Sequence, residues 1–491
     1  MKKVSFVCTT YGRFTCVERI VAQYHAQTYP NKELIIFNTD EEHPYELGFE
    51  DDSIIIVNNN INYQTACEYE NRGQICRDAV THATGDYFML ADDDDIYLPW
   101  HIQQAVEAAK KAFPIWSEMS AKKRSNVLLK LSSLIEENLS EFALAESKDN
   151  GKPLWLATTV DIPRAAENFH FYATAILHHA SESHSMGKLA INYTLKHPIG
   201  IVGCISPWNL PLYLFSWKIA PALAAGNCVV AKPSEVTPMT AFLLSKLCKQ
   251  AGMPDGVLNV VHGLGERVGD AITRHPEIKA ISFTGGTQTG AAIAKIAAPM
   301  FKKLSLELGG KNPNIIFDDC DFEDALNTTV NSSFRNQGQI CLCGSRIFVQ
   351  KGIYEKFKKD FIEKVAELKV GHPSEENTNI GALVSKEHLE KVKSYIDIAS
   401  KEGGKLLFGG ERVSVNNCEN GYYLQPAIIE VSDNQCRLNQ EEIFGPLVTI
   451  MSFKTDEEAL QLANDVKYGL SSTLWTNNLN RTMQFSKQLQ A

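Results

Sequence analysis

Short apolar runs alternate with helical stretches along the chain. In the first hundred residues, four runs rich in β-branched residues predict strands, at residues 4–8, 34–37, 54–57 and 87–91. Helical patterns lie between the first two runs and before the fourth. Strands that alternate with helices are typical of a parallel, doubly wound sheet. The pattern therefore predicts an α/β fold from the start of the chain.

The same alternation continues after residue 103. Helices are expected over residues 103–113 and 121–144. Three strand–helix units follow, at residues 228–251, 257–274 and 281–298. The last third has strands near 313–316, 345–349 and 446–453, and helices at 322–335, 353–368 and 386–402. The α/β prediction thus extends to the whole chain.

The most apolar long stretch, residues 199–231, does not read as a membrane span. It contains three prolines, Asn209 and Lys218, which are unfavourable in a hydrocarbon core. The apolar run after Lys2 and Lys3 is too short for a signal peptide. We therefore expect a cytoplasmic protein without a membrane partner.

Charge separates the first fifth of the chain from the rest. The 491 residues carry a net charge of −10, and residues 1–100 hold 7 basic and 17 acidic side chains, which accounts for the whole excess. An acidic chain without basic runs argues against a nucleic-acid partner. The 12 cysteines include no CxxC pair, so neither a zinc site nor a disulfide framework is indicated.

A run of aspartates ends the fourth predicted strand, in GDYFMLADDDDIYLP at residues 85–99. Carboxylates at the carboxyl end of a strand face the usual ligand crevice of an α/β sheet. Spaced carboxylates can hold Mg²⁺ or Mn²⁺, which in turn binds a diphosphate. The alternative interpretation is a solvated acidic turn.

With the opening strand VSFVCTTYGR, this segment resembles the nucleotide-binding half of family-2 glycosyltransferases of the GT-A fold. The resemblance implies that Thr9 and Tyr11 lie at the nucleotide edge and Asp40 near the base. The Mn²⁺ or Mg²⁺ site would be formed by Asp93, Asp94 and Asp95. The resemblance covers about 100 residues, and the acceptor half with its catalytic base has no counterpart.

Three later segments carry residues suited to acyl chemistry. Cys341 follows a polar, glycine-containing turn in FRNQGQICLCGSRI, where a thiol with a lowered pKa would be a nucleophile. Taken alone, it would be read as a buried thiol. LSLELGGK places Glu307 before a Gly-Gly turn, and ISPWNLP places Asn209 between prolines. Nucleophile, base and amide donor together form a set for acyl transfer.

Six motifs, occurring in order, make residues 103–491 resemble the NAD(P)-dependent aldehyde dehydrogenase superfamily: SPWNLP, VVAKPSE, SFTGGT, LELGGK, the cysteine motif and EEIFGP. The resemblance implies Cys341 as nucleophile, Glu307 as general base, and an oxyanion hole formed by Asn209 with the Cys341 N–H. It also implies NAD as cofactor, a small aldehyde as substrate and no catalytic metal. The implied cofactor contacts are Trp208, Lys232, Glu235, Gly285, Gly286, Thr287, Glu442 and Phe444.

Part of the cofactor site also follows from the residues. The strand at 281–284, the Gly285-Gly286 turn and a helix from Thr287 would present amide N–H groups to a phosphate. GLGERVG at 263–269 is one residue longer than the dinucleotide fingerprint, and we interpret it as a helix-entry turn. Glu235 would accept the ribose hydroxyls and repel a 2′-phosphate, which favours NAD over NADP.

The substrate prediction depends on the amino-acid sequence in and around these motifs. FTGGT, ICLCGSRIFVQ and DIPRAAENFHFYA most resemble the 2-hydroxymuconic and 2-aminomuconic semialdehyde dehydrogenases. Arg164 would then bind a substrate carboxylate, since its planar fork suits that role. A surface-helix arginine is the alternative.

We therefore expect a partial GT-A segment over 1–102, a Rossmann NAD-binding domain over 103–308 with a bridging hairpin at about 186–198, and an α/β catalytic domain over 309–491. Relative to the family, both ends of the aldehyde dehydrogenase part are expected to be truncated. The family is homo-oligomeric, and we expect truncation to weaken assembly. A nucleotide-sugar glycosyltransferase and an inactive fusion are the alternative functions.

Overall fold

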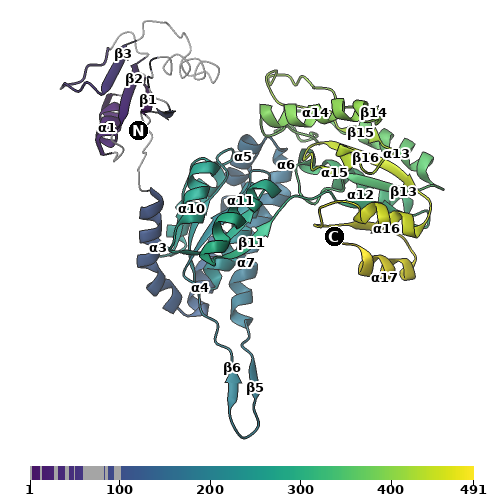
Figure 1. Ribbon diagram of the computed structural model, residues 1–491, viewed down its shortest axis with the longest axis horizontal. Helices are drawn as coiled ribbons and strands as arrows, with labels where there is room; N and C mark the ends of the chain where they lie inside the picture. Colours follow the sequence, from purple (N-terminus) through teal and green to yellow (C-terminus); the bar gives the residue numbers. More distant parts are fainter. Residues whose placement is uncertain are drawn as a thin grey trace. The chain divides into compact units, whose positions relative to one another are not determined.

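The computed structural model describes residues 3–10, 14–26, 31–38, 44–48, 50–58, 82, 84, 87–92 and 101–490. The chain divides into two compact units, residues 1–104 and 105–491. Figure 1 shows the helices and strands, coloured from purple at the N-terminus to yellow at the C-terminus.

The first unit contains a four-stranded parallel sheet in the order β3-β2-β1-β4. Its elements are β1 (Val4–Thr10), α1 (Phe14–Ala26), β2 (Lys32–Asn38), β3 (Ile54–Asn58) and β4 (Tyr87–Asp92). Val17, Ile20 and Tyr24 of α1 form a buried cluster with Leu34 and Ile36 of β2. The four strands predicted from the apolar runs are therefore present.

Three helices follow: α3 (His101–Glu118), α4 (Ala121–Glu137) and α5 (Leu139–Asn150). The prediction of one helix over 121–144 was wrong, because the chain leaves helical geometry at Asn138 (φ −106°). The Asn138 side chain donates to the Leu134 carbonyl at 2.7 Å, which satisfies an end carbonyl of α4. Beyond α5 come α6 (Leu154–Leu156), a π-helical turn (Ala157–Asp161) and α7 (Ile162–Ala175).

A five-stranded parallel sheet in the order β11-β10-β7-β8-β9 forms the next layer. Its strands are β7 (Ile201–Ile205), β8 (Cys228–Lys232), β9 (Leu258–Val260), β10 (Ile278–Thr284) and β11 (Lys303–Glu307). The connecting helices are α8 (Pro211–Ala224), α9 (Met239–Gln250), α10 (Asp270–Arg274) and α11 (Thr287–Ala297). The strand order reverses between β7 and β10, and such a switch point opens a ligand crevice at the carboxyl ends of the strands.

An antiparallel hairpin of β5 (Ser183–Ser185) and β6 (Ile191–Tyr193) projects from this layer (Figure 1). The paired strands begin at Ser183, whereas the sequence predicts a start at about residue 186. Leu189 and Ile191 are 92% and 73% exposed, so the hairpin presents an apolar surface.

The last third folds around a six-stranded sheet in the order β14-β15-β16-β13-β12-β17, parallel except where β14 meets β15. Its strands are β12 (Pro313–Ile316), β13 (Arg346–Gln350), β14 (Lys405–Phe408), β15 (Ala427–Glu430), β16 (Leu447–Phe453) and β17 (Thr473–Trp475). The helices are α12 (Phe322–Phe334), α13 (Tyr354–Ala366), α14 (Lys386–Lys401), α15 (Arg437–Gln440), α16 (Asp456–Asn464) and α17 (Leu479–Gln488).

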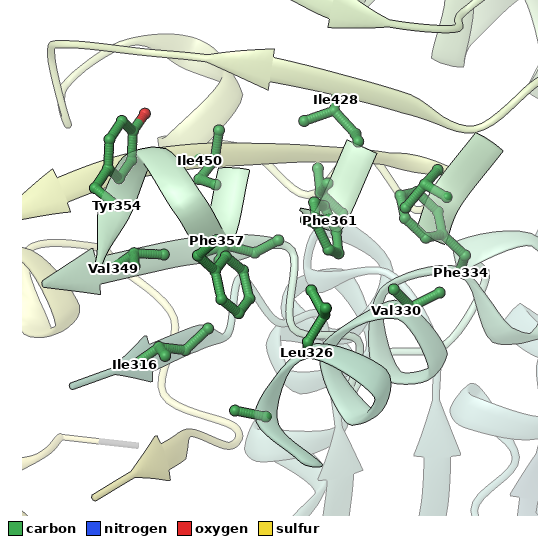
Figure 2. Close-up of a cluster of buried hydrophobic side chains, with 14 of the residues drawn as sticks. Ile316, Leu326, Val330, Phe334, Val349, Tyr354, Phe357, Phe361, Ile428 and Ile450 are labelled. Atoms are coloured by element: carbon green, nitrogen blue, oxygen red, sulfur yellow. The ribbon is translucent and has the colours of Figure 1, made fainter. Parts of the chain in front are cut away.

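Aromatic side chains hold helices to both faces of this sheet. On one face, Phe334, Phe357 and Phe361 of α12 and α13 pack over strand residues such as Val349 and Ile450 (Figure 2). A second buried cluster, containing Phe317, Phe453 and Phe485, joins the sheet to α16 and α17. Each buried phenylalanine contributes about 1.5–3 kcal/mol of transfer free energy. The loops that carry the site are thus mounted on a rigid scaffold.

Among the described residues, no helix combines the length and the apolar character needed to cross a membrane.

Candidate active site

The loop that carries Cys341 follows α12 through a tight left-handed turn. Asn336, Gln337 and Gly338 have φ values of 51°, 56° and 68° in succession. A Cβ atom at Gly338 would lie 2.2 Å from the Gly445 carbonyl oxygen, so only glycine allows this close approach. The turn therefore sets Cys341 against the segment around Gly445, about a hundred residues away in the sequence.

The surroundings of Cys341 oppose its ionisation. Burial raises the pKa of the Cys341 thiol to about 11, and the negative charges of Glu442 and Glu307 act in the same direction. Backbone N–H groups at Cys341 and Leu342 partly offset this by donating to the sulfur. The cofactor-free protein therefore holds a thiol, and the reaction requires its activation. The neighbouring Cys343 is also buried, and such a thiol behaves as a small hydrophobic side chain.

Glu307 is the last residue of β11 and is exposed at the carboxyl edge of the five-stranded sheet. Its backbone carbonyl accepts a hydrogen bond from the Gly285 N–H at 3.0 Å. The negative charge of its carboxylate contributes to the raised pKa of the Cys341 thiol. The predicted base therefore lies within electrostatic range of the predicted nucleophile.

Asn209 lies in the turn between β7 and α8 and is only 3% exposed. Its Nδ2 donates to the Gln339 carbonyl at 2.9 Å, two residues before Cys341. An amide nitrogen has two N–H groups, so this bond uses one of the two donors of Asn209. The oxyanion donor and the nucleophile predicted from separate motifs thus lie on touching loops.

The structure adds Lys218, which the sequence analysis used only as a charge that excludes a membrane span. It is 5% exposed within the apolar helix α8. Burial lowers its pKa to about 8, while the charges of Cys204 and Glu307 act in the opposite direction. The signal available in the sequence was a lone lysine within the apolar helix α8.

Lys232 and Glu235 follow β8 at the same edge of the sheet. Lys232 Nζ lies 2.7 Å from Glu235 Oε2, and the lysine is 2% exposed. Burial alone would raise the pKa of Glu235, but Lys232 and backbone N–H groups, including that of Gly265, lower it. Gly265 begins a helical turn that ends at Gly269, as predicted for GLGERVG. An ionised carboxylate is therefore available to ribose hydroxyls.

The helix α11 begins in a form suited to phosphate. Gly286 is its N-cap and provides no side-chain hydrogen bond, so the first N–H groups of the helix remain available. A Cβ atom at Gly286 would meet nothing within 4 Å, which leaves room for a ligand. Gly285, Gly286 and Thr287 thus fit a pyrophosphate.

Glu442 and Phe444 lie on the segment that precedes β16 of the six-stranded sheet. Glu442 Oε1 accepts the Gly310 N–H at 2.9 Å. Phe444 has a φ of 64°, which is uncommon for an aromatic residue. Its ring lies 5.4 Å from the ring of Trp208, edge to face. Three predicted cofactor contacts therefore lie on two segments that touch: Trp208 after β7, and Glu442 and Phe444 before β16.

His388 of α14, which the sequence did not single out, supports this conformation. Burial lowers the pKa of His388 to about 4, so the imidazole is neutral at pH 7. Its Nε2 donates to the Phe444 carbonyl at 2.7 Å, and its ring lies 5.1 Å from that of Trp208.

Arg164 lies on α7 with its side chain 46% exposed. It forms a 3.1 Å ion pair with Glu167, and its guanidinium stacks 5.9 Å from the Tyr213 ring and 5.8 Å from the Trp217 ring of α8. It is thus a surface-helix residue that also contacts the helix leading from Asn209. The predicted metal ligands Asp93, Asp94 and Asp95, with Tyr11 and Asp40, lie outside the described residues.

Residues 98–491 match the aldehyde dehydrogenase family. The 2-aminomuconic semialdehyde dehydrogenase of Bos taurus is 52% identical over 396 residues, which are 79% of this chain and 81% of that protein. The 5-carboxymethyl-2-hydroxymuconate semialdehyde dehydrogenase of Escherichia coli is 43% identical, over 79% of this chain and 83% of its own length. The NAD+ complex of an aldehyde dehydrogenase from Bacillus cereus superposes with a TM-score of 0.77 at 40% identity, covering 79% of each chain.

These similarities support neither the glycosyltransferase resemblance of residues 1–102 nor a Mn²⁺ or Mg²⁺ site there. A parallel sheet alone does not distinguish between the many functions that such sheets carry.

Proposed function

Since this chain belongs to the aldehyde dehydrogenase family and oxidises an aldehyde to a carboxylic acid with NAD, we propose that its substrate is a semialdehyde bearing a carboxylate. The chemistry of the proposal rests on the hydrogen bond between the Asn209 turn and the Cys341 loop, and on Glu307, whose charge acts on the Cys341 thiol. Two of the relatives described above are named for semialdehydes of this kind.

In the proposed mechanism, the Cys341 thiolate forms a carbon–sulfur bond with the aldehyde carbon, and the carbonyl oxygen becomes an oxyanion. The free N–H of the Asn209 amide and the backbone N–H of Cys341 stabilise that oxyanion. NAD would supply the acceptor for the hydride that leaves this carbon, and the product would remain on Cys341 as a thioester. Glu307 then takes a proton from water, and the hydroxide displaces the Cys341 sulfur to release the acid.

The residues at the carboxyl edge of the five-stranded sheet fit the cofactor. Lys232 and Glu235 would hold the adenosine ribose, and Gly285, Gly286 and Thr287 the pyrophosphate. Trp208, Glu442 and Phe444 would lie at the nicotinamide end. The ionised Glu235 favours NAD over NADP, because a 2′-phosphate would add a like charge beside it.

Arg164 would bind the carboxylate of the substrate. Its guanidinium is half exposed and is oriented by the rings of Tyr213 and Trp217, on the helix that begins directly after Asn209. Arg164 would exchange its partner Glu167 for the substrate carboxylate, since an exposed ion pair contributes little stability.

The test compares glutaric semialdehyde with its methyl ester, followed by NADH absorbance. Arg164→Met should lower kcat/KM for the acid about 10- to 100-fold, the range for a hydrogen bond between charged groups, and leave the ester unchanged. Arg274→Met is the matched control, because Arg274 is also a helix-surface arginine paired with a carboxylate, Asp270, at 2.7 Å. Equal losses on acid and ester would contradict the proposed role of Arg164.

A further inference from the structure

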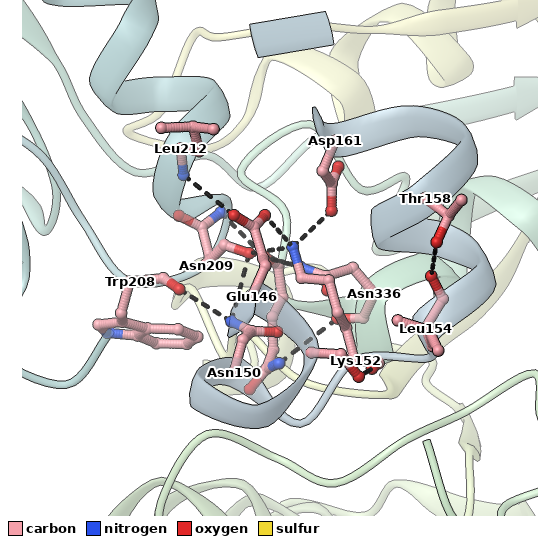
Figure 3. Close-up of polar contacts among 12 residues, drawn as sticks. Glu146, Asn150, Lys152, Leu154, Thr158, Asp161, Trp208, Asn209, Leu212 and Asn336 are labelled. Carbon is pink, nitrogen blue, oxygen red and sulfur yellow. Dashed lines mark hydrogen bonds and ion pairs between the residues drawn. The ribbon is translucent and has the colours of Figure 1, made fainter. Parts of the chain in front are cut away.

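The backbone carbonyl of Asn209 is held by three side chains from two parts of the fold (Figure 3). Asn336 donates to it at 3.0 Å, Lys152 at 3.3 Å and Asn150 at 3.4 Å. Asn150 also donates to the Trp208 carbonyl at 2.8 Å. Three donors on one carbonyl fix the orientation of its peptide group. They therefore also fix the direction in which the Asn209 side chain leaves the backbone.

Asn336 differs from the other two donors because it belongs to the loop of the nucleophile. Its Nδ2 also lies 3.3 Å from the Gln339 carbonyl, which is the acceptor of the Asn209 amide at 2.9 Å. The two asparagines and Gln339 therefore close a ring of hydrogen bonds between the Asn209 turn and the Cys341 loop.

Asn336 occupies this place at a cost to stability. It is 1% exposed, it has a φ of 51°, and its Oδ1 is buried without a hydrogen-bond partner. Left-handed backbone and an unsatisfied buried oxygen are both unfavourable. Asparagine tolerates the left-handed region better than most residues, and its amide supplies two donors there. The neighbouring Gln337 shares these features, so Asn336 is distinguished by its hydrogen bonds to the Asn209 turn.

A buried charge cluster holds the far side of the same turn. Lys152 is fully buried and lies 3.2 Å from Glu146 Oε1 and 2.5 Å from Asp161 Oδ2. Glu146 Oε2 accepts the Leu212 N–H at 3.2 Å, in the first turn of α8. The buried charge cluster thus holds the Asn209 turn on one side, and Asn336 of the Cys341 loop holds it on the other.

We propose that Asn336 is a positioning residue: its amide locks the oxyanion donor Asn209 in register with Cys341. The inference rests on the proposed role of Asn209, through which Asn336 acts without touching the substrate itself. It predicts that the effect of removing the Asn336 amide disappears when Asn209 has already been removed.

The test is a double-mutant cycle of Asn336→Gly and Asn209→Ala in the full chain. Glycine accepts the left-handed backbone, so it removes the amide without adding strain. The probe is p-nitrophenyl acetate, whose hydrolysis reports acylation of Cys341 without a hydride step. We expect Asn209→Ala to lower the acylation rate about 100- to 1,000-fold, the scale of one oxyanion donor. Asn336→Gly should lower it about tenfold, and by less than about twofold in the Asn209→Ala background.

Gln337→Gly is the matched control. Gln337 is equally buried and left-handed, and it also donates to a backbone carbonyl, but to that of Ala382 at 3.0 Å instead of that of Asn209. Its effect should be the same in both backgrounds, as expected for a structural role. An undiminished Asn336→Gly effect in the Asn209→Ala background would overturn the positioning role. Full acylation by Asn209→Ala alone would instead refute the oxyanion role on which the inference rests.

Discussion

The sulfur of Cys341 and the groups around it form a site with two carboxylates and one nearby lysine. Burial and the charges of Glu442 and Glu307 raise the pKa of the thiol, and burial lowers the pKa of Lys218. Burial thus disfavours the charged form of both side chains, and the proposed reaction needs the Cys341 sulfur as a thiolate. Such opposing environments are common where enzymes control when a nucleophile ionises.

Alkylation of Cys341 in the cofactor-free protein should reveal its raised pKa. Because only the thiolate reacts and the pKa is about 11, the rate with iodoacetamide should rise about tenfold per pH unit from pH 7 to pH 10. An ordinary thiol would reach a plateau near pH 9. Mass spectrometry of the Cys341 peptide measures the rate, and Glu307→Gln should increase it at pH 8. A plateau below pH 9 would contradict the buried, carboxylate-flanked setting.

The parallel sheet explains why residues far apart in the sequence meet. Asn209, Lys232, Gly285 and Glu307 each end or follow a strand of the β11-β10-β7-β8-β9 sheet. Parallel strands place their carboxyl ends on one edge, so these residues share that edge. Close packing of helices on the sheet keeps the strands in register.

Gly203 in β7 should be essential for that packing. A Cβ atom there would lie 2.6 Å from Ile272 Cγ2 of α10 and 2.9 Å from Ile281 Cδ1 of β10. Gly203→Ala should therefore lower the free energy of unfolding by about 1–3 kcal/mol, the usual effect of overpacking. Urea denaturation measures the change. Gly286→Ala is the control for stability, since its Cβ would meet nothing within 4 Å, and an equal loss in both variants would argue against overpacking.

At the scale of the whole molecule, the proposed chemistry belongs to one of two compact units. All the predicted catalytic and NAD contacts lie within residues 105–491, and the family match begins at residue 98. A ligand stabilises only the unit that binds it. Thermal unfolding can therefore separate the contributions of the two units.

NAD should raise the melting temperature of the transition that belongs to residues 105–491. At 100 times its Kd, the stabilisation is about 2.7 kcal/mol by mass action. NADP at the same concentration should stabilise less, because its 2′-phosphate would face the Glu235 carboxylate. Differential scanning calorimetry measures both shifts, and Glu235→Gln should narrow the difference between them. Equal shifts with NAD and NADP in the unaltered protein would refute the proposed role of Glu235.

Most of the elements and the family could be predicted from the amino-acid sequence. Apolar periodicity is a local property, so the strands of both larger sheets near 228–232, 278–284 and 446–453 were predictable, as were α11 and α12. Motifs in order identified the aldehyde dehydrogenase family, which the comparisons confirm. The break at Asn138 escaped prediction, because both of its flanking helices continue the same apolar spacing.

Which polar residues contact those motifs depends on how the chain folds in three dimensions. Asn336 reaches Asn209 across 127 positions of the chain, and His388 reaches Phe444 across 56. Lys218 is near Glu307 because α8 packs against β7, β8 and β10 of the sheet that ends in Glu307. Burial and pairing of this kind depend on how distant segments meet, whereas periodicity and motif order depend on neighbours in the chain. The reactive groups could therefore be read from the sequence, and the residues that orient them could not.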